Sequence, residues 1–310
     1  MPKIIRDLLF FKDRPISSAV TIGNFDGVHK GHQRLLLLLK DESRSKDLSS
    51  VVITFDPHPL KVLTGNPPLS ITPLEQKIDL LASFSPDYIL ILHFDKKFAN
   101  LEPEDFVKTY LVDLLSSKVV IVGHDYRFGK GGRGDFELLK RLGQRYGFEV
   151  KRIDPVTVKG EIVSSTKIRK LVQEGEIEKV RDFLGRFYEV RGVVVQGQKR
   201  GGPLLGVPTA NLKLIDELYP KVGVYAVFVI VEGTRFLGVA NVGFNPTFGE
   251  NPISVEAHIF DFSKDIYGKK IRVQFVKRLR DEKKFPDIES LKKQIFLDIQ
   301  RAKEELKKIL

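Results

Sequence analysis

The pattern of apolar segments changes once along this 310-residue chain, and that change limits the folds it can adopt. Up to Gly185, short apolar runs typical of strands alternate with amphipathic segments typical of helices. From Arg186 onward, apolar runs follow one another with only short turns between them. We therefore expect an α/β domain at residues 1–185 and a β-rich domain at residues 186–310.

The first domain is expected to contain a parallel sheet. Apolar runs rich in β-branched residues predict strands at residues 19–22, 51–55, 88–92 and 118–122. Helical patterns lie between them, at residues 34–40, from about residue 72, and at residues 103–115. Thr72 and Glu75 are expected to form a capping box around Pro73. The alternation favours a Rossmann-like parallel sheet with helices on both faces, whose ligands lie at the carboxyl ends of the strands.

The second domain is expected to be an antiparallel β-barrel. Its apolar runs cover residues 188–195, 224–231, 236–242, 255–260 and 271–276. Closely spaced strands without helices between them favour this architecture. An amphipathic pattern at residues 287–309 predicts a terminal helix after the barrel.

A glycine-rich turn follows the first predicted strand, in the sequence GNFDGVHKGH at residues 23–32. Glycines permit a sharp turn and the close approach of a ligand, and the next helix offers free amides to an anion. His29 and His32 can donate hydrogen bonds to a phosphoryl group in transfer. Histidines at this spacing also occur in metal sites, but only Asp26 stands nearby as a further ligand and the chain has no cysteine. The turn therefore predicts phosphate binding.

Two more segments of the first domain combine polar groups with a strand end or a helix start. Residues 123–135 follow the last predicted strand and are rich in glycine and cations, which fits either a ligand-binding loop or a flexible surface turn. Residues 164–169, with the sequence SSTKIR, place hydroxyls and cations at the start of a helix. Such a start serves either as an anion site or as a plain helix cap.

The β-rich domain carries a second polar constellation. A glycine-rich stretch at residues 197–202 precedes Thr209 and Asn211, two neutral oxygen donors that suit Mg²⁺ beside a phosphate, although both residue types are also common in turns. Glu256 is a carboxylate in an otherwise apolar strand, where alternation also permits a solvent-facing position. Phosphorylation of a neutral hydroxyl needs a base of this kind.

In this order along the chain, these segments resemble those of the prokaryotic bifunctional riboflavin kinase/FAD synthetases. The resemblance implies that the first domain transfers an adenylyl group from ATP to FMN, with His29 and His32 facing the triphosphate. The residues that would bind ATP there are Gly23, Asn24, Phe25, Asp26, Gly27, His29, Gly31, His32, Ser164, Ser165, Thr166 and Arg169. The residues that would bind the flavin are Phe55, Asp125, Arg127 and Phe128, with Tyr126 in place of the family's usual Phe.

For the barrel, the resemblance implies a riboflavin kinase in which Glu256 is the catalytic base. The implied ATP-binding residues are Gly197, Lys199, Gly201, Pro208, Thr209 and Asn211, and Thr209 and Asn211 would also contact Mg²⁺. Arg280 and Phe285 would contact the flavin from a flap. The glycine arch is one residue longer than the usual family form. Riboflavin, FMN and FAD would be substrates and products, together with ATP.

The net charge of +11 is consistent with several classes of partner. Its lysines and arginines are scattered, which favours a solvated basic surface and steering of polyphosphates over nucleic-acid binding. The chain has no cysteine, no apolar stretch long enough to span a bilayer and no signal-peptide pattern, so we expect a cytoplasmic enzyme without disulfides. Its oligomeric state is not predicted.

Two alternatives to this function remain at the level of the sequence. One is a nucleotidyltransferase for another substrate, which the PTAN segment of the barrel disfavours. The other is a basic nucleic-acid-binding or flavin-binding protein without turnover, for which we would expect only salt-sensitive association.

Overall fold

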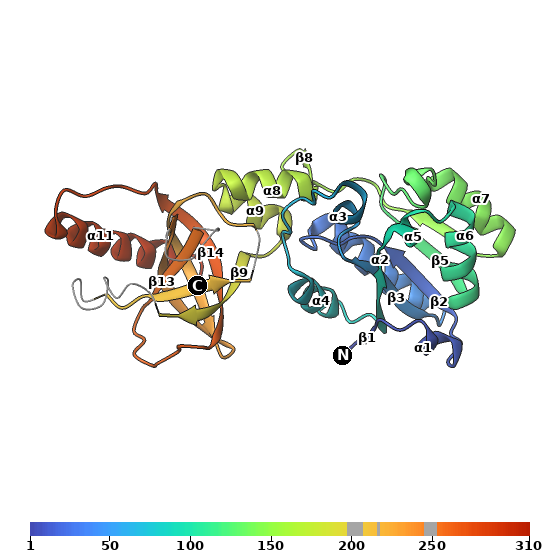
Figure 1. Ribbon diagram of the computed structural model, residues 1–310, viewed down its shortest axis with the longest axis horizontal. Helices are drawn as coiled ribbons and strands as arrows, with labels where there is room; N and C mark the ends of the chain where they lie inside the picture. The colour runs from blue at the N-terminus through green and yellow to red at the C-terminus, as the bar shows by residue number, and fades with distance from the viewer. Residues whose placement is uncertain (197–206, 216–217, 245–252) are drawn as a thin grey trace. The chain divides into compact units, whose positions relative to one another are not determined.

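The computed structural model describes residues 1–196, 207–215, 218–244 and 253–310 (Figure 1). The chain forms two compact units, Met1–Ser165 and Thr166–Leu310. Each unit has its own apolar core.

Residues 1–165, all of which are described, contain a six-stranded parallel sheet. Its strands are β1 (Lys3–Ile5), β2 (Ser18–Ile22), β3 (Ser49–Asp56), β4 (Tyr88–His93), β5 (Ser117–Val122) and β6 (Glu149–Arg152). The predicted Rossmann-like sheet is confirmed, since β2 to β5 match the four expected strands. The edge strands β1 and β6 were not predicted, because β1 has only three residues and three of the four residues of β6 are charged.

Helices cover both faces of this sheet (Figure 1). They are α1 (Leu9–Lys12), α2 (Lys30–Ser45), α3 (Pro59–Thr64), α4 (Leu74–Ala82), α5 (Lys96–Ala99), α6 (Pro103–Phe106), the π-helical η1 (Val107–Leu114), the 3₁₀ turn η2 (Lys130–Gly132) and α7 (Phe136–Tyr146). One face packs against α2 and α4 through Leu36 and Leu81. The other packs against α6, η1 and α7 through Phe106, Leu111 and Leu139. A two-stranded hairpin, β7 (Thr157–Val158) and β8 (Glu161–Ile162), ends the unit.

The order of the strands reverses at one place, between β2 and β5. The sheet reads β1-β4-β3-β2-β5-β6, so the chain runs from β2 toward β4 on one side and then crosses to β5 on the other. Ligands of open α/β sheets bind beside such a reversal, at the carboxyl ends of the strands. The glycine turn follows β2, Phe55 lies near the end of β3, and residues 123–135 follow β5. The fold thus brings three of the predicted segments to neighbouring strand ends.

In the second unit, six of the described strands close into an antiparallel barrel, as the sequence predicts. They are β9 (Tyr188–Val195), β10 (Ala210–Leu214), β11 (Gly223–Val231), β12 (Thr234–Phe244), β13 (Ile253–Ile259) and β14 (Lys270–Arg280). The helices α8 (Ser165–Glu174) and α9 (Ile177–Leu184) precede them, and α9 ends at Gly185, which adopts a left-handed φ of 69°. Strand β10 was not predicted.

The terminal helix α11 (Ile288–Lys307) lies beside the barrel (Figure 1). The Asp287 side chain accepts a hydrogen bond from the Ser290 amide and caps its first turn. Ala302 and Leu306 pack on Val224 and Phe228 of β11. Because these strand residues touch a helix outside the barrel, alternate positions of the strands face outward beneath α11.

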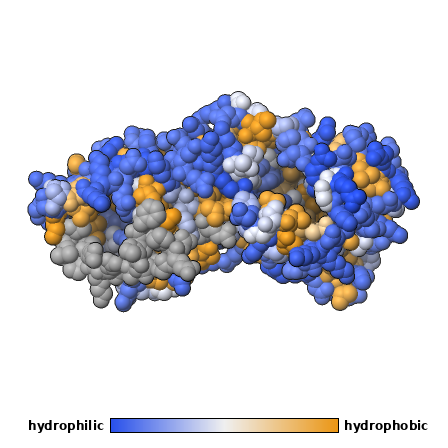
Figure 2. Space-filling model, turned by 45° about the horizontal axis from the view of Figure 1, so that its top comes forward, coloured by the Kyte–Doolittle hydropathy of each residue, from blue (hydrophilic) through white to orange (hydrophobic). Residues whose placement is uncertain are grey.

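The surface is mainly polar in the view of Figure 2, where apolar side chains form separate patches. In the basic stretch near residue 280, Arg278 pairs with Asp281 at 2.6 Å and Lys277 pairs with Glu305 at 3.0 Å. Part of its charge is therefore compensated locally. Among the described residues, no helix combines the length and the apolar composition that crossing a membrane requires.

Candidate active sites

The glycine turn of the first unit has an unusual backbone. Phe25, Gly27 and Val28 all have positive φ, at 53°, 81° and 37°. A Cβ atom on Gly27 would lie 3.1 Å from the Ile71 side chain, so a side chain at this position is disfavoured by both conformation and space. The Phe25 ring is fully buried and meets the His32 ring edge-on, with centroids 5.2 Å apart. Phe25 therefore supports the turn from within the core.

Residues before α4 hold this turn in shape. The buried Asp26 carboxylate accepts hydrogen bonds from the amides of Ile71 and Thr72, each with a shortest distance of 3.0 Å. The Thr72 hydroxyl accepts one from the Gly27 amide, also at 3.0 Å. The predicted capping box is wrong, since α4 is capped by Pro73 without a side-chain hydrogen bond. Thr72 bonds to the turn instead, a contact 45 residues away that a local pattern does not reveal.

The two histidines lie together at the start of α2. His29 is the N-cap, and its Nδ1 accepts a hydrogen bond from the His32 amide at 3.3 Å. The two rings stack, with centroids 3.6 Å apart and planes 15° apart. A Cβ on Gly31 would lie 3.1 Å from the His29 ring, so glycine leaves room for this imidazole. Since Nδ1 accepts, neutral His29 carries its proton on Nε2 and can donate it to a phosphate.

Ser165 joins the serine segment to the turn. Its hydroxyl donates to the Asp26 carbonyl oxygen at 2.9 Å, which places Ser164 and Ser165 beside residues 23–28. Thr166 and Arg169 follow in α8, within the second compact unit. The structure thus brings the histidines, the glycine turn and both serines together.

The predicted flavin residues of this unit have different surroundings. The Phe55 ring lies 5.9 Å from Phe98, which lies 6.0 Å from Phe106, which in turn lies 5.9 Å from Phe128. These four rings form one continuous aromatic cluster. Phe128 is buried within it, whereas Asp125 is exposed and Arg127 pairs with Asp135 at 3.7 Å. A cavity of about 280 Å³ opens beside Phe98 and is also lined by Arg6, His93, Lys97 and Tyr110.

In the barrel, strand register places the predicted residues Asn211, Glu256 and Arg280 in one row with Asn241. Asn211 of β10 stands opposite Glu256 of β13, which stands opposite Asn241 of β12. Asn241 stands opposite Val224 of β11, and Val224 stands opposite Arg280 of β14. Residues directly opposite one another in paired strands share a face of the sheet. This row carries the four polar side chains around the outside of the barrel.

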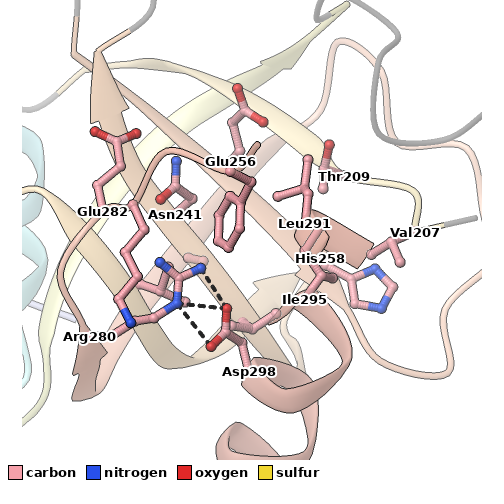
Figure 3. Close-up of a pocket in the computed structure, with 15 residues that line it drawn as sticks. Val207, Thr209, Asn241, Glu256, His258, Arg280, Glu282, Leu291, Ile295 and Asp298 are labelled. Atoms are coloured by element: carbon pink, nitrogen blue, oxygen red, sulfur yellow. Dashed lines mark hydrogen bonds and ion pairs between the residues drawn. The ribbon is translucent and has the colours of Figure 1, made fainter. Parts of the chain in front are cut away.

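The row borders a cavity of about 410 Å³ between the barrel and α11 (Figure 3). Its polar lining includes Thr209, Asn241 and Glu256, and its apolar lining includes Val239 and Ile295. Burial raises the pKa of Glu256 above the ordinary value for a glutamate. A carboxylate whose pKa is raised by burial, in a mainly apolar pocket, is suited to accept a proton from a hydroxyl.

The floor of this cavity contains a buried ion pair that the sequence did not predict. Arg280 Nη2 lies 2.7 Å from Asp298 Oδ2, and Arg280 Nε lies 3.0 Å from both carboxylate oxygens (Figure 3). Gln294 also donates to Asp298 at 2.9 Å. The predicted flavin residues Arg280 and Phe285 both line the cavity, with the guanidinium 5.9 Å from the Phe285 ring centre. Asp298 therefore fixes the direction of Arg280.

A second cavity, of about 280 Å³, lies on the other side of Thr209. Pro208, Ala257, Ile259 and Tyr267 belong to its lining. The His258 Nδ1 lies 2.8 Å from the Pro208 carbonyl oxygen and holds the segment that bears Thr209. The predicted residues Gly197, Lys199 and Gly201 lie outside the described part of the chain. Thr209 thus separates two cavities, an arrangement suited to transfer between two substrates.

These features define a class of protein: a two-unit transferase with a glycine turn on a Rossmann-like sheet and, on a β-barrel, a mainly apolar pocket that contains a buried glutamate. Family models agree with this class. The FAD synthetase model matches residues 12–167, and the riboflavin kinase model matches residues 184–306.

Full-length relatives agree as well. The chain is 38% identical over 97% of both chains to the bifunctional riboflavin kinase/FMN adenylyltransferase of Escherichia coli K12. It is 39% identical to the enzyme of the same name from Listeria monocytogenes, over 92% of this chain and 91% of that one. The chain belongs to the bifunctional riboflavin kinase/FMN adenylyltransferase family, which confirms the resemblance seen in its motifs.

A solved structure shares the whole architecture. It is a crystal structure described as a macrolide-efflux protein from Streptococcus pneumoniae, with a TM-score of 0.87 and 33% identity, over 97% of this chain and 98% of that one. Its name refers to a different activity, but both units of this chain have their counterparts in it.

Proposed function

We propose that this chain carries both activities of its family, riboflavin phosphorylation in the barrel and adenylyl transfer to FMN in the α/β domain. We assign the second reaction to residues 1–185 and the first to residues 186–310. One observation carries the proposal: Glu256 stands in the middle of the cross-strand row and lines the same cavity as Thr209.

For the kinase reaction, we assign the cavity beneath α11 to riboflavin and the cavity beyond Thr209 to the base of ATP. Glu256 accepts the proton of the terminal ribityl hydroxyl as that oxygen attacks the γ-phosphorus. The new P–O bond forms as the bond to the β-phosphate oxygen breaks, and ADP leaves. Arg280 and Phe285 border the flavin, with Arg280 held in place by Asp298.

The proposed Mg²⁺ site uses the oxygens of Thr209 and Asn211. Asn211 is buried opposite the Glu256 carboxylate, and Thr209 lines both cavities, so hard oxygen donors stand where the phosphates of ATP would pass. Mg²⁺, when bound, would neutralise charge on those phosphates.

For adenylyl transfer, the FMN phosphate is already an anion and needs no base. One of its oxygens attacks the α-phosphorus of ATP, and pyrophosphate leaves. The Nε2–H of His29 and the amides of Lys30 and Gly31, in the first turn of α2, donate to the phosphate oxygens as negative charge moves onto the leaving group. The aromatic cluster of Phe55, Phe98, Phe106 and Phe128 supplies an apolar surface for the isoalloxazine ring.

A direct assay tests both reactions. Purified protein is incubated with ATP, Mg²⁺ and either riboflavin or FMN, and the flavins are separated by chromatography with fluorescence detection. We expect FMN and then FAD from riboflavin, and FAD with pyrophosphate from FMN. Flavin binding or salt-sensitive nucleic-acid binding without either product would contradict the proposal and favour a binding protein.

A further inference from the structure

A buried lysine lies directly behind the glycine turn. Lys77 is the fourth residue of α4, and the residue is only 6% exposed. Its Nζ donates to the carbonyl oxygen of Asn24 at 3.1 Å and to that of Phe55 at 3.4 Å. Asn24 belongs to the turn that is predicted to bind the nucleotide, whereas Phe55, near the end of β3, is predicted to bind the flavin. One ammonium therefore joins the backbones of two substrate-binding segments.

The Asn24 carbonyl receives a second donor, the Thr54 hydroxyl of β3 at 3.1 Å. The side chain of Asn24, in contrast, has an unpaired acceptor: its Oδ1 is buried without a hydrogen-bond partner among the described residues. Two donors thus hold the backbone carbonyl of Asn24, and its side-chain oxygen remains an acceptor that no described residue uses. This is the arrangement expected of a residue that presents a group to a ligand.

Carboxylates keep the Lys77 ammonium charged in spite of its burial. Desolvation lowers the pKa of Lys77 to about 8, and the charges of Asp26 and Asp56 oppose that shift. Asp26 is committed to the amides of Ile71 and Thr72, and Asp56 pairs with Arg6 at 3.4 Å. The lysine thus donates chiefly to backbone carbonyls, and a buried cation with backbone acceptors is costly to keep unless its position matters.

We propose that Lys77 is a positioning residue for adenylyl transfer, because its ammonium sets the separation between the nucleotide turn and the flavin-side end of β3. This inference rests on the proposed function of the first domain. In-line attack requires the FMN phosphate and the α-phosphorus to be held within a narrow range of distances, and small displacements reduce the rate strongly. Lys77 acts through Asn24 and Phe55 and does not itself contact the reacting atoms.

The sequence of α4 contains a signal for this buried lysine. In α4, Leu74, Ile78 and Leu81 recur at helical spacing and define the face toward the sheet, and Lys77 falls on the same face. A charged residue on an apolar face requires a buried partner. Only the fold shows that the partners are two carbonyl oxygens at neighbouring strand ends.

The test uses the full chain, because its barrel provides an internal reference. Lys77→Met removes the ammonium and keeps the apolar stem. We expect kcat/KM for FAD formation from FMN to fall about 10- to 100-fold, the effect of losing charge-assisted hydrogen bonds, with FMN formation from riboflavin unchanged. Lys140→Met, which removes an exposed lysine of α7, is the matched control and is expected to keep both rates.

A pH profile separates positioning from a purely structural role. Wild-type FAD formation should decline as the pH rises through the region of 8, where Lys77 loses its proton, and riboflavin phosphorylation should not share this decline. In Lys77→Met, the alkaline decline should be absent. Lys77→Gln, which keeps a neutral donor, should fall between the methionine variant and the wild type.

Several results would overturn the inference. If the wild type forms FAD and Lys77→Met forms it at the same rate, Lys77 has no positioning role, and the proposed function survives. If the wild type forms no FAD, the proposed function itself fails. If Lys77→Met also loses the kinase reaction and so its fold, the wild-type profile decides: an alkaline decline confined to FAD formation supports the inference, and its absence refutes it.

Discussion

Under the proposed function, the glycine turn of the α/β domain and the polar row of the barrel are two different ways of building a site for phosphates. The turn consists of backbone in left-handed conformations, held by the buried side chains of Asp26 and Lys77. The row consists of side chains, brought to one face by the register of the barrel strands. In the first site, the protein's charged groups shape the backbone, and in the second they face the cavity.

The chemistry of the two nucleophiles accounts for this difference. A phosphate monoester is already an anion, so a site that attacks with it needs donors and alignment. An alcohol must lose its proton, so a site that attacks with it needs a carboxylate at the reacting oxygen. If the comparison is right, removing the carboxylate from the row should strongly reduce only riboflavin phosphorylation. Removing an imidazole from the turn should strongly reduce only adenylyl transfer.

The largest effect is expected from Glu256→Gln. Losing a general base costs roughly 10²- to 10⁴-fold in rate, so FMN formation from riboflavin should fall by that factor while FAD formation from FMN stays at the wild-type rate. Steady-state rates of the two half-reactions measure this. Glu304→Gln, on the exposed side of α11, is the charge-matched control. Equal loss of both reactions would contradict the assignment of Glu256.

His29→Asn tests the turn. Asparagine is a good N-cap and preserves the start of α2, but it lacks the Nε2–H donor. Removal of one transition-state donor costs about 10²- to 10³-fold in kcat, so FAD formation should fall by this factor with little change in the KM for FMN. The kinase reaction should not change. A variant that forms FAD at the wild-type rate would show that His29 serves only as a cap.

A smaller effect is expected from pH, and it should differ between the two reactions. Burial raises the pKa of Glu256, and the base works only when ionised, so kinase activity is present above that pKa and is lost as the pH falls through it. Below that pKa the rate should fall about tenfold per pH unit, starting at a higher pH than an ordinary glutamate would give. Rates at saturating riboflavin and ATP measure this. Adenylyl transfer should lack this acid limb, and a limb common to both reactions would contradict the comparison.

Much of the fold could be predicted because its signals are local. The strands β2 to β5 are continuous apolar runs, and the barrel strands follow one another across short turns, so period and spacing are enough to recognise them. The edge strand β1 was not predicted because it has only three residues, and β6 was not predicted because three of its four residues are charged, which an edge position permits. Strand β10 was not predicted because it is short and two of its five residues, Asn211 and Lys213, are polar.

The residues of the two candidate sites also fall into two groups, those that the sequence reveals and those that it does not. The turn with its histidines, the serine segment and Glu256 are each contiguous in sequence, and the motifs that contain them could be read directly. Thr72, Lys77 and Asp298 could not, because each acts through partners 18 to 53 residues away. Their residue types are ordinary for a helix or its start, and the residues next to them in the sequence do not indicate their hydrogen-bond partners.

By itself, the sequence determined that the chain has an α/β part and a barrel part and to which family it belongs, and it predicted which residues carry the chemistry. The tertiary structure decided how those residues are held: a buried ammonium shared by two strand ends, a carboxylate behind the glycine turn, and a register that aligns Asn211, Glu256, Asn241 and Arg280. The physical reason is that periodicity and propensity act over neighbouring residues, whereas charge compensation and strand pairing depend on groups that meet only after the chain has folded.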